Sequence, residues 1–152
     1  MLLIKNVTFF DEGQKVVARI PEVTGSLVAL LSQDDLSLRS SAVLVLRNLS
    51  YLTTMQTALI NTEGFVAGVA SALRSGHPVA CCAAVALCWQ LLTNSRKAKS
   101  VLTSGEHLET LKSAVYSLDG VSDEETADVL ARVKELLKQD CAQGFSRLPT
   151  HF

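Results

Sequence analysis

The sequence repeats itself at a spacing of 42 residues. The segment from Leu2 to Phe10 aligns with the segment from Leu44 to Leu52, and the aligned pairs are chemically alike, with Lys on Arg, Asn on Asn and Phe on Tyr. A further shift of 42 residues places Asn48 on Gln90 and keeps the apolar positions in phase. Internal repeats of this length indicate stacked supersecondary units, each covering the apolar face of its neighbour.

The spacing of apolar residues within each repeat predicts helices. Between Leu36 and Ile60 these residues recur with a period near 3.6 residues, which is the period of an α-helix. We expect a turn around Gly64, and we expect Pro78 in the first turn of a later helix, where its missing N–H costs little. Gly105 is expected to repeat the turn of Gly64. The predicted helices cover residues 36–60, 65–73, 79–102 and 107–118.

The C-terminal part of the chain carries a signal for one more helix. The segment 122–125 has the form of a capping box, with Ser122 as the residue that satisfies the first backbone amides. We expect this helix to span residues 122–139, with a favourable surface pair between Asp128 and Arg132.

Composition favours an all-α domain and excludes several other classes. The 152 residues include only 8 Gly and 3 Pro, which disfavours a turn-rich β-sandwich. The net charge of −1 lacks the basic excess of nucleic-acid-binding domains, and the longest apolar run, residues 79–89, is too short for a membrane span. We therefore expect neither nucleic acid nor a membrane as a partner. The four cysteines, two of them adjacent at Cys81 and Cys82, are typical of reduced, intracellular core residues.

No set of residues in the sequence points to catalysis. The three histidines, at positions 77, 107 and 151, have no cysteine or carboxylate at metal-ligand spacing. The sequence contains neither a glycine-rich phosphate loop nor a nucleophile elbow. We therefore expect a protein that is not an enzyme and that holds no metal or cofactor.

The repeat resembles an armadillo repeat. Residues 42–49 have the pattern Ala-x-x-Val-Leu-x-Asn-Leu, and Asn-Thr-Glu-Gly follows at 61–64. The resemblance implies an all-α, armadillo/HEAT-like α-solenoid of about three repeats, each of about 42 residues, with a C-terminal capping helix. The expected organisation is one domain over residues 1–139 and a flexible tail over residues 140–152. The parts of the domain are a truncated repeat at 1–33, repeats at 34–75 and 76–118, and the capping helix at 122–139.

The same resemblance suggests contact residues. In armadillo solenoids an asparagine on the long third helix of each repeat binds the backbone of an extended peptide, and Asn6, Asn48 and Gln90 occupy that position. The alternative is that these amides brace the neighbouring repeat. Peptide-binding grooves of this type carry Trp four residues earlier, where this chain has Leu, Leu and Ala. The candidate partner-binding residues are Lys5, Asn6, Arg47, Asn48, Tyr51, Trp89, Gln90, Arg96 and Lys97.

The basic run at residues 96–99 allows two interpretations. It could contact an acidic partner. Alternatively, its charge could favour the C-terminal end of the predicted helix 79–102, because cations stabilise that end of a helix.

Three segments resemble one particular family. They are residues 46–49, residues 87–99 with Trp89 and Asn94, and residues 114–118. Together they resemble the C-terminal armadillo-like region of the rotatin family, large centriolar proteins that include the insect anastral spindle protein. The similarity covers residues 44–118, about half of the chain.

The rotatin resemblance implies a scaffold that acts in centriole assembly and cilium formation and docks a small helical centriolar protein. The implied location is the cytoplasm and cytoskeleton, at the centrosome with its centrioles and at the basal body of the cilium. Two alternatives remain. One is a generic peptide-groove adaptor of the transport or adhesion type, and the other is a structural module that self-associates through its truncated first repeat.

Overall fold

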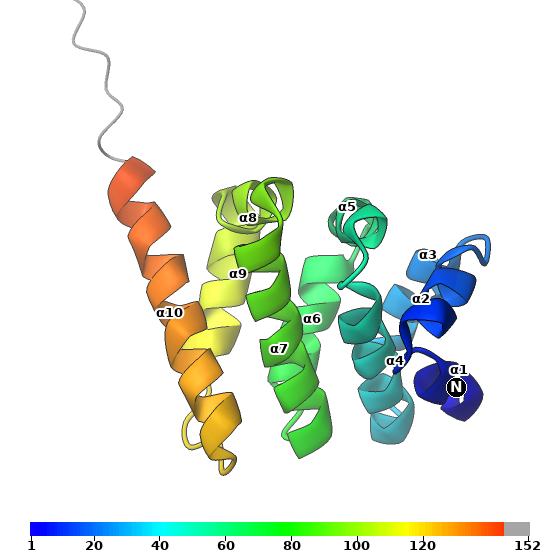
Figure 1. The fold of residues 1–152 in the computed structure, drawn as a ribbon. Coiled ribbons are helices and arrows are strands. Elements are labelled where there is room, and N and C mark those ends of the chain that lie inside the picture. The colour runs from blue at the N-terminus through cyan, green and yellow to red at the C-terminus, as the bar shows by residue number, and fades with distance from the viewer. Residues whose placement is uncertain (145–152) are drawn as a thin grey trace, which may run out of the picture.

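The computed structural model describes the backbone of residues 1–144 and the side chains of residues 1–138, and this part of the chain is all-helical (Figure 1). Short connections join the consecutive helices. In chain order the helices are α1 (Leu2–Val7), α2 (Asp11–Ala18), α3 (Val23–Leu30), α4 (Leu36–Leu49), α5 (Thr53–Asn61), α6 (Phe65–Leu73), α7 (Pro78–Asn94), α8 (Arg96–Leu102), α9 (Gly105–Tyr116) and α10 (Glu124–Gly144).

The helices form two packed layers and an edge. Helices α1, α4, α7 and α10 lie side by side in what we name the front layer, with α4 between α1 and α7 and α7 between α4 and α10 (Figure 1). Helices α3, α6 and α9 form the rear layer, in which α6 packs against both α3 and α9. The short helices α5 and α8 pack together at the upper edge in Figure 1, and α2 packs against α1 and α4. This arrangement is compatible with a repeat of three helices.

The buried residues of the front layer follow a regular register. Each of its three long helices buries side chains at intervals of three and then four residues, and α10 shares this pattern with α4 and α7. Helix α10, which contains most of the predicted capping helix 122–139, therefore packs beside α7 in the front layer. The buried sets are Ala42, Val45 and Leu49 on α4, Ala84, Leu87 and Leu91 on α7, and Leu130, Val133 and Leu137 on α10.

The prediction of one helix over residues 36–60 is wrong. Helix α4 ends at Leu49 and α5 begins at Thr53, because the chain turns a corner that a glutamine side chain closes. The Nε2 atom of Gln56 donates to the carbonyl oxygen of Ser50 at 2.8 Å, and both residues are buried. Gln14 makes the equivalent bond to the carbonyl of Thr8 at 3.0 Å, 42 residues earlier in the chain. The repeat therefore includes a buried polar corner as well as an apolar pattern.

The prediction of one helix over residues 79–102 is also wrong. The chain bends by 118° between α7 and α8. At this bend the Oγ atom of Ser95 accepts from the backbone N–H of Ala98 at 3.1 Å and so caps α8. Other details of this region are confirmed, since Pro78 is the first residue of α7 and Gly64 and Gly105 have positive φ angles of 79° and 53°.

Helix α10 differs from its prediction at both ends. Asp123, rather than Ser122, caps its N-terminus, because its Oδ2 atom accepts from the backbone N–H of Thr126 at 2.8 Å. The helix continues to Gly144, so residues 140–144 are helical rather than part of a tail. The rest of the predicted tail, residues 145–152, lies outside the described residues.

One continuous apolar core joins the layers. It extends from Val17 on α2 to Leu137 on α10, so every unit shares buried contacts with the next. Burial of this face, more than local helix propensity, stabilises the short helices, because isolated helices of this length are marginal in water.

Candidate interaction surfaces

Three of the predicted contact residues lie in a row across the front layer. Lys5, Arg47 and Trp89 follow one another at intervals of 42 residues on α1, α4 and α7, and these helices pack side by side. All three side chains are partly exposed. The repeat therefore places two cations and an indole at equivalent positions of three neighbouring helices.

A residue that was not among the predicted partner contacts extends this row. The guanidinium of Arg132 on α10 lies 6.0 Å from the centre of the Trp89 ring, at the limit of a cation–π interaction. The predicted pair with Asp128 is confirmed, with 3.1 Å between Arg132 Nε and Asp128 Oδ2, although both side chains are mostly exposed and the pair adds little stability. We name Lys5, Arg47, Trp89 and Arg132 the basic–aromatic row.

Asn48 does not belong to an exposed contact surface. Its side chain is 2% exposed, and its Nδ2 atom donates to Thr8 Oγ1 at 3.2 Å. Its Oδ1 atom accepts from Nε and Nη2 of Arg47, at 3.2 and 2.9 Å. The prediction of Asn48 as a partner contact is therefore wrong in this structure. Asn48 instead matches the alternative interpretation, because its amide braces the preceding unit through Thr8. The same amide also orients Arg47.

The other predicted amides have different surroundings. Asn6 is exposed on α1, whereas Gln90 is partly buried and its Oε1 atom accepts from Asn94 Nδ2 at 3.1 Å. The three amides therefore do not form a row of equivalent groups. Tyr51 is 57% exposed and lies in the turn that follows α4.

Arg96 and Lys97 lie apart from the basic–aromatic row. Both are exposed and occupy the first turn of α8, at the edge formed by α5 and α8 (Figure 1). Their predicted role at the C-terminal end of a long helix is wrong, because α7 ends at Asn94. Cations at a helix N-terminus do not gain from the helix dipole, so a favourable helix end does not explain them.

A cleft of about 210 Å³ opens on the front layer beside the row. Arg47 of α4 lines one part of it, and Asp123 and Glu125 at the start of α10 line another. Ala86 of α7 also lines the cleft, and its small side chain occupies the position that carries a leucine, Leu44, one repeat earlier. The cleft therefore combines opposite charges with an apolar surface.

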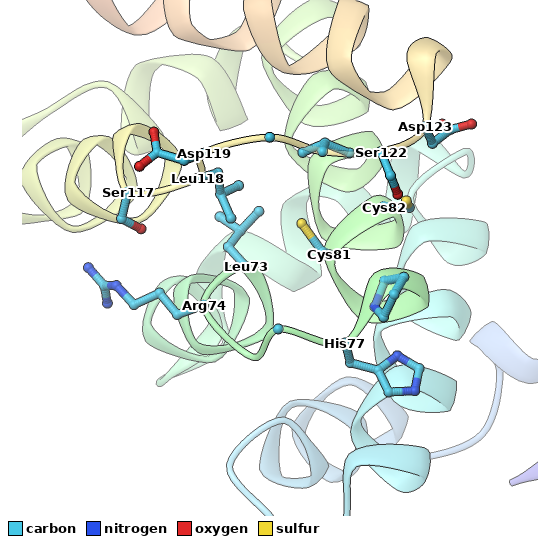
Figure 2. A pocket seen from close by; sticks show the side chains of 14 residues that line it. Leu73, Arg74, His77, Cys81, Cys82, Ser117, Leu118, Asp119, Ser122 and Asp123 are labelled. Carbon is cyan, nitrogen blue, oxygen red and sulfur yellow. The ribbon is translucent and has the colours of Figure 1, made fainter.

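A larger pocket of about 450 Å³ lies between the α6–α7 and α9–α10 connections (Figure 2), which are at the lower edge of the molecule in Figure 1. Leu73, Cys81 and Leu118 lie toward its centre, and charged residues surround them (Figure 2). Neither the repeat nor any motif predicted this pocket. The one signal in the chain was the longer connection before α10, since seven residues separate α9 from α10 and four separate α6 from α7.

Two of the three cysteines of α7, Cys81 and Cys88, have the surroundings of core residues, as predicted, and the side chain of Cys141 lies outside the described residues. Burial raises the pKa of the Cys88 thiol to about 12. The pKa of Cys81 is also raised, first by burial and then by the neighbouring Cys82. Cys82 is partly exposed, with its Sγ atom 3.2 Å from Thr126 Oγ1. Buried thiols of raised pKa are poor nucleophiles, so this cluster does not resemble a catalytic cysteine site.

Comparison with known proteins does not show which family the chain belongs to. No family model matches the chain, and no curated protein or solved structure matches it. Within the described residues, no three side chains of the types His, Cys, Asp or Glu come together as a metal site. No single helix in that part of the chain has the length and apolar composition to cross a membrane.

Proposed function

We propose that the chain is an armadillo-like α-solenoid module that binds a helical protein partner and catalyses no reaction. The basic–aromatic row is the observation that carries this proposal. Trp and Arg are the residue types that most often dominate the energy of protein interfaces, and here they lie together, partly exposed, across neighbouring helices. An array spread over several helices suits a protein surface better than a small molecule.

The internal order of the row supports a binding role. Arg47 donates two hydrogen bonds to Oδ1 of Asn48, a buried side chain, so its guanidinium is already oriented. Side chains that are already oriented lose less conformational entropy when a partner binds. The front layer therefore presents one guanidinium group, that of Arg47, that needs little rearrangement.

The cellular role that we propose rests on the resemblance to the rotatin family. In this proposal the chain is a scaffold module of a centriolar protein and works in centriole assembly and cilium formation. Its partner is a small helical centriolar protein, and its location is the centrosome and the basal body of the cilium. The segments that support it are residues 46–49, 87–99 and 114–118, which include Arg47 and Trp89 of the row.

Affinity capture with the full 152-residue chain from ciliated or dividing cells tests this proposal. We expect mass spectrometry to identify one small centriolar protein, and light scattering to give a one-to-one complex. Trp89→Ala should weaken its binding about tenfold or more, as expected for an interface hot spot. Arg19→Ala, at an exposed arginine in the turn that follows α2, serves as the control.

The outcomes separate the alternatives. Diverse clients that share an extended charged segment would favour a generic peptide adaptor. A complex that survives both Trp89→Ala and Arg47→Ala, with both variants folded by circular dichroism, would refute the row as the binding site.

Self-association is a second candidate, because the α1–α2 end exposes large apolar side chains. Leu2, Leu3 and Phe10 are 66%, 75% and 71% exposed, whereas Val45, the counterpart of Leu3 one repeat later, is 0% exposed. Sedimentation at several concentrations would show a dimer that Phe10→Glu disrupts. Val79→Glu, at another exposed apolar position, should leave that dimer intact. A monomer at all concentrations would exclude this candidate.

A further inference from the structure

The pocket at the lower edge arises from a local change in the repeat. The buried residues of α10 follow those of α7 by 46 residues, whereas those of α7 follow those of α4 by 42. The longer step includes the seven-residue connection 117–123, which runs along one side of the pocket in Figure 2. The opposite side is the end of α6 and the start of α7. The pocket is therefore specific to the last two units of the chain.

The pocket has an apolar interior. Leu73 is 1% exposed and Cys81 is 9% exposed, and Leu118 and Val121 are partly buried. Its volume of about 450 Å³ falls in the range of ligand-binding pockets, about 300–1,000 Å³. Such an interior gains free energy when it covers an apolar side chain.

The rim of the pocket is unequal in charge. Asp119 and Asp123 lie on the side of the α9–α10 connection, and Glu124 and Glu125 follow immediately in the first turn of α10. The opposite side carries Arg74 and His77 (Figure 2).

The basic side of the rim is partly engaged within the chain. Arg74 Nη2 donates to Ser113 Oγ at 3.0 Å, and His77 Nδ1 accepts from the backbone N–H of Ala80 at 3.4 Å. Asp119, by contrast, is exposed at the mouth of the pocket. These hydrogen bonds leave the charge of Arg74 in place, but the two carboxylates Asp119 and Asp123 outnumber its single guanidinium, so the charge of the lining is mainly negative.

We infer that this edge pocket binds an extended peptide segment of a protein partner, in which a large apolar side chain lies next to a lysine or arginine. The apolar side chain enters the pocket against Leu73 and Leu118. The cation pairs with Asp119 and adds to the attraction of the acidic first turn of α10. This site lies on the α6–α7 and α9–α10 connections and does not depend on the basic–aromatic row.

Selection from a displayed library of random 12-residue linear peptides against the full chain tests this inference. The enriched peptides should share an apolar residue beside Lys or Arg. Asp119→Lys should weaken the binding of a selected peptide about tenfold or more, since it replaces attraction by repulsion. Asp34→Lys reverses an exposed acidic residue in the equivalent connection between α3 and α4, and it should leave the affinity unchanged.

A second variant tests the pocket itself rather than its charge. Ser122 is exposed and lines the pocket, so Ser122→Trp should obstruct the mouth and weaken the same peptide without disturbing the core. Failure to enrich any peptide would overturn the inference, as would peptides that bind Asp119→Lys and Ser122→Trp as tightly as the original chain. Peptides whose binding is lost in Arg47→Glu but kept in Asp119→Lys would overturn this inference and would instead support binding at the front layer.

Discussion

Thr8 connects three parts of the molecule through buried hydrogen bonds. Its hydroxyl donates to the Lys5 carbonyl at 3.0 Å and accepts from Asn48, while its own carbonyl accepts from Gln14. Thr8 is 0% exposed, so water cannot replace these partners. A buried polar group that loses its partner costs more than the bond itself contributes, which makes this cluster sensitive to change.

Replacement of Asn48 tests the brace between units. Asn48→Ala should lower the free energy of unfolding by about 1–3 kcal/mol, because it leaves the hydroxyl of Thr8 and the guanidinium of Arg47 without their amide partner. Urea denaturation measures the change. Asn61→Ala, at an exposed asparagine, is the control and should have little effect. Equal stability of the two variants would show that the brace contributes nothing.

The cysteines of α7 should differ in reactivity. Because burial raises the pKa of the Cys88 thiol to about 12, this side chain is almost entirely in its unreactive thiol form at pH 8. Iodoacetamide should therefore leave Cys88 unmodified in the folded chain while it modifies the partly exposed Cys82. Peptide mapping by mass spectrometry distinguishes the two sites. Equal rates of modification would contradict the buried position of Cys88.

Individual helices were predictable where a single local signal decides them. Pro78 is the first residue of α7, where its missing N–H costs little. Gly64 stands directly before α6 with a positive φ, which glycine adopts more easily than other residues. The corners at Ser50 and Ser95 were not predictable from apolar spacing, because the buried residues of both adjoining helices keep a helical period through the break. What divides the helices there is a polar side chain, and apolar periodicity does not detect it.

The same distinction applies to the candidate site. The repeat of 42 residues is sufficient to place Lys5, Arg47 and Trp89 on equivalent positions. It could not place Arg132, because the longer α9–α10 connection shifts α10 out of that register. It also could not reveal that Asn48 is buried, since an amide at a given repeat position can face either a neighbour or solvent.

The corner glutamines are a structural element of the repeat, and Gln56 tests it. Gln56→Leu keeps the side chain volume but leaves the buried carbonyl of Ser50 without its donor at 2.8 Å. We expect the free energy of unfolding to fall by about 1–3 kcal/mol. Gln33→Leu, at an exposed position, provides a control in the urea titration. A variant as stable as the original chain would mean that the turn after α4 forms without the glutamine.

The stability of the fold should depend on pH through Asp123, which caps the start of α10. Hydrogen bonds from the hydroxyl and then the backbone N–H of Thr126 lower the pKa of Asp123 below its ordinary 3.8. A lowered pKa in the folded state stabilises the fold above the pKa of the unfolded state, and this contribution disappears as the pH falls through the folded value. Between neutral pH and pH 3 the melting temperature should therefore fall more for the original chain than for Asp123→Asn, which keeps a capping oxygen but cannot titrate. Parallel pH profiles of the two proteins would contradict this role of Asp123.

At the scale of the whole molecule, the continuous core makes the units interdependent. The apolar cluster runs from Val17 to Leu137 without separating the repeats, although stacked repeats can in principle unfold one by one. Leu46 lies on the central helix α4 with 0% exposure. A cavity at this position should therefore lower the stability of the entire chain rather than that of one unit.

Leu46→Ala tests this cooperativity. It should lower the free energy of unfolding by about 2–5 kcal/mol, which is the cost of truncating a fully buried leucine. Far-ultraviolet circular dichroism follows all helices, whereas the fluorescence of Trp89, the single tryptophan of the chain, follows the front layer alone. In one cooperative unit the two transitions coincide and shift together in the variant. If the fluorescence transition of Leu46→Ala separates from the helical transition, the front layer and its neighbours unfold independently, and the basic–aromatic row can be lost while other helices persist.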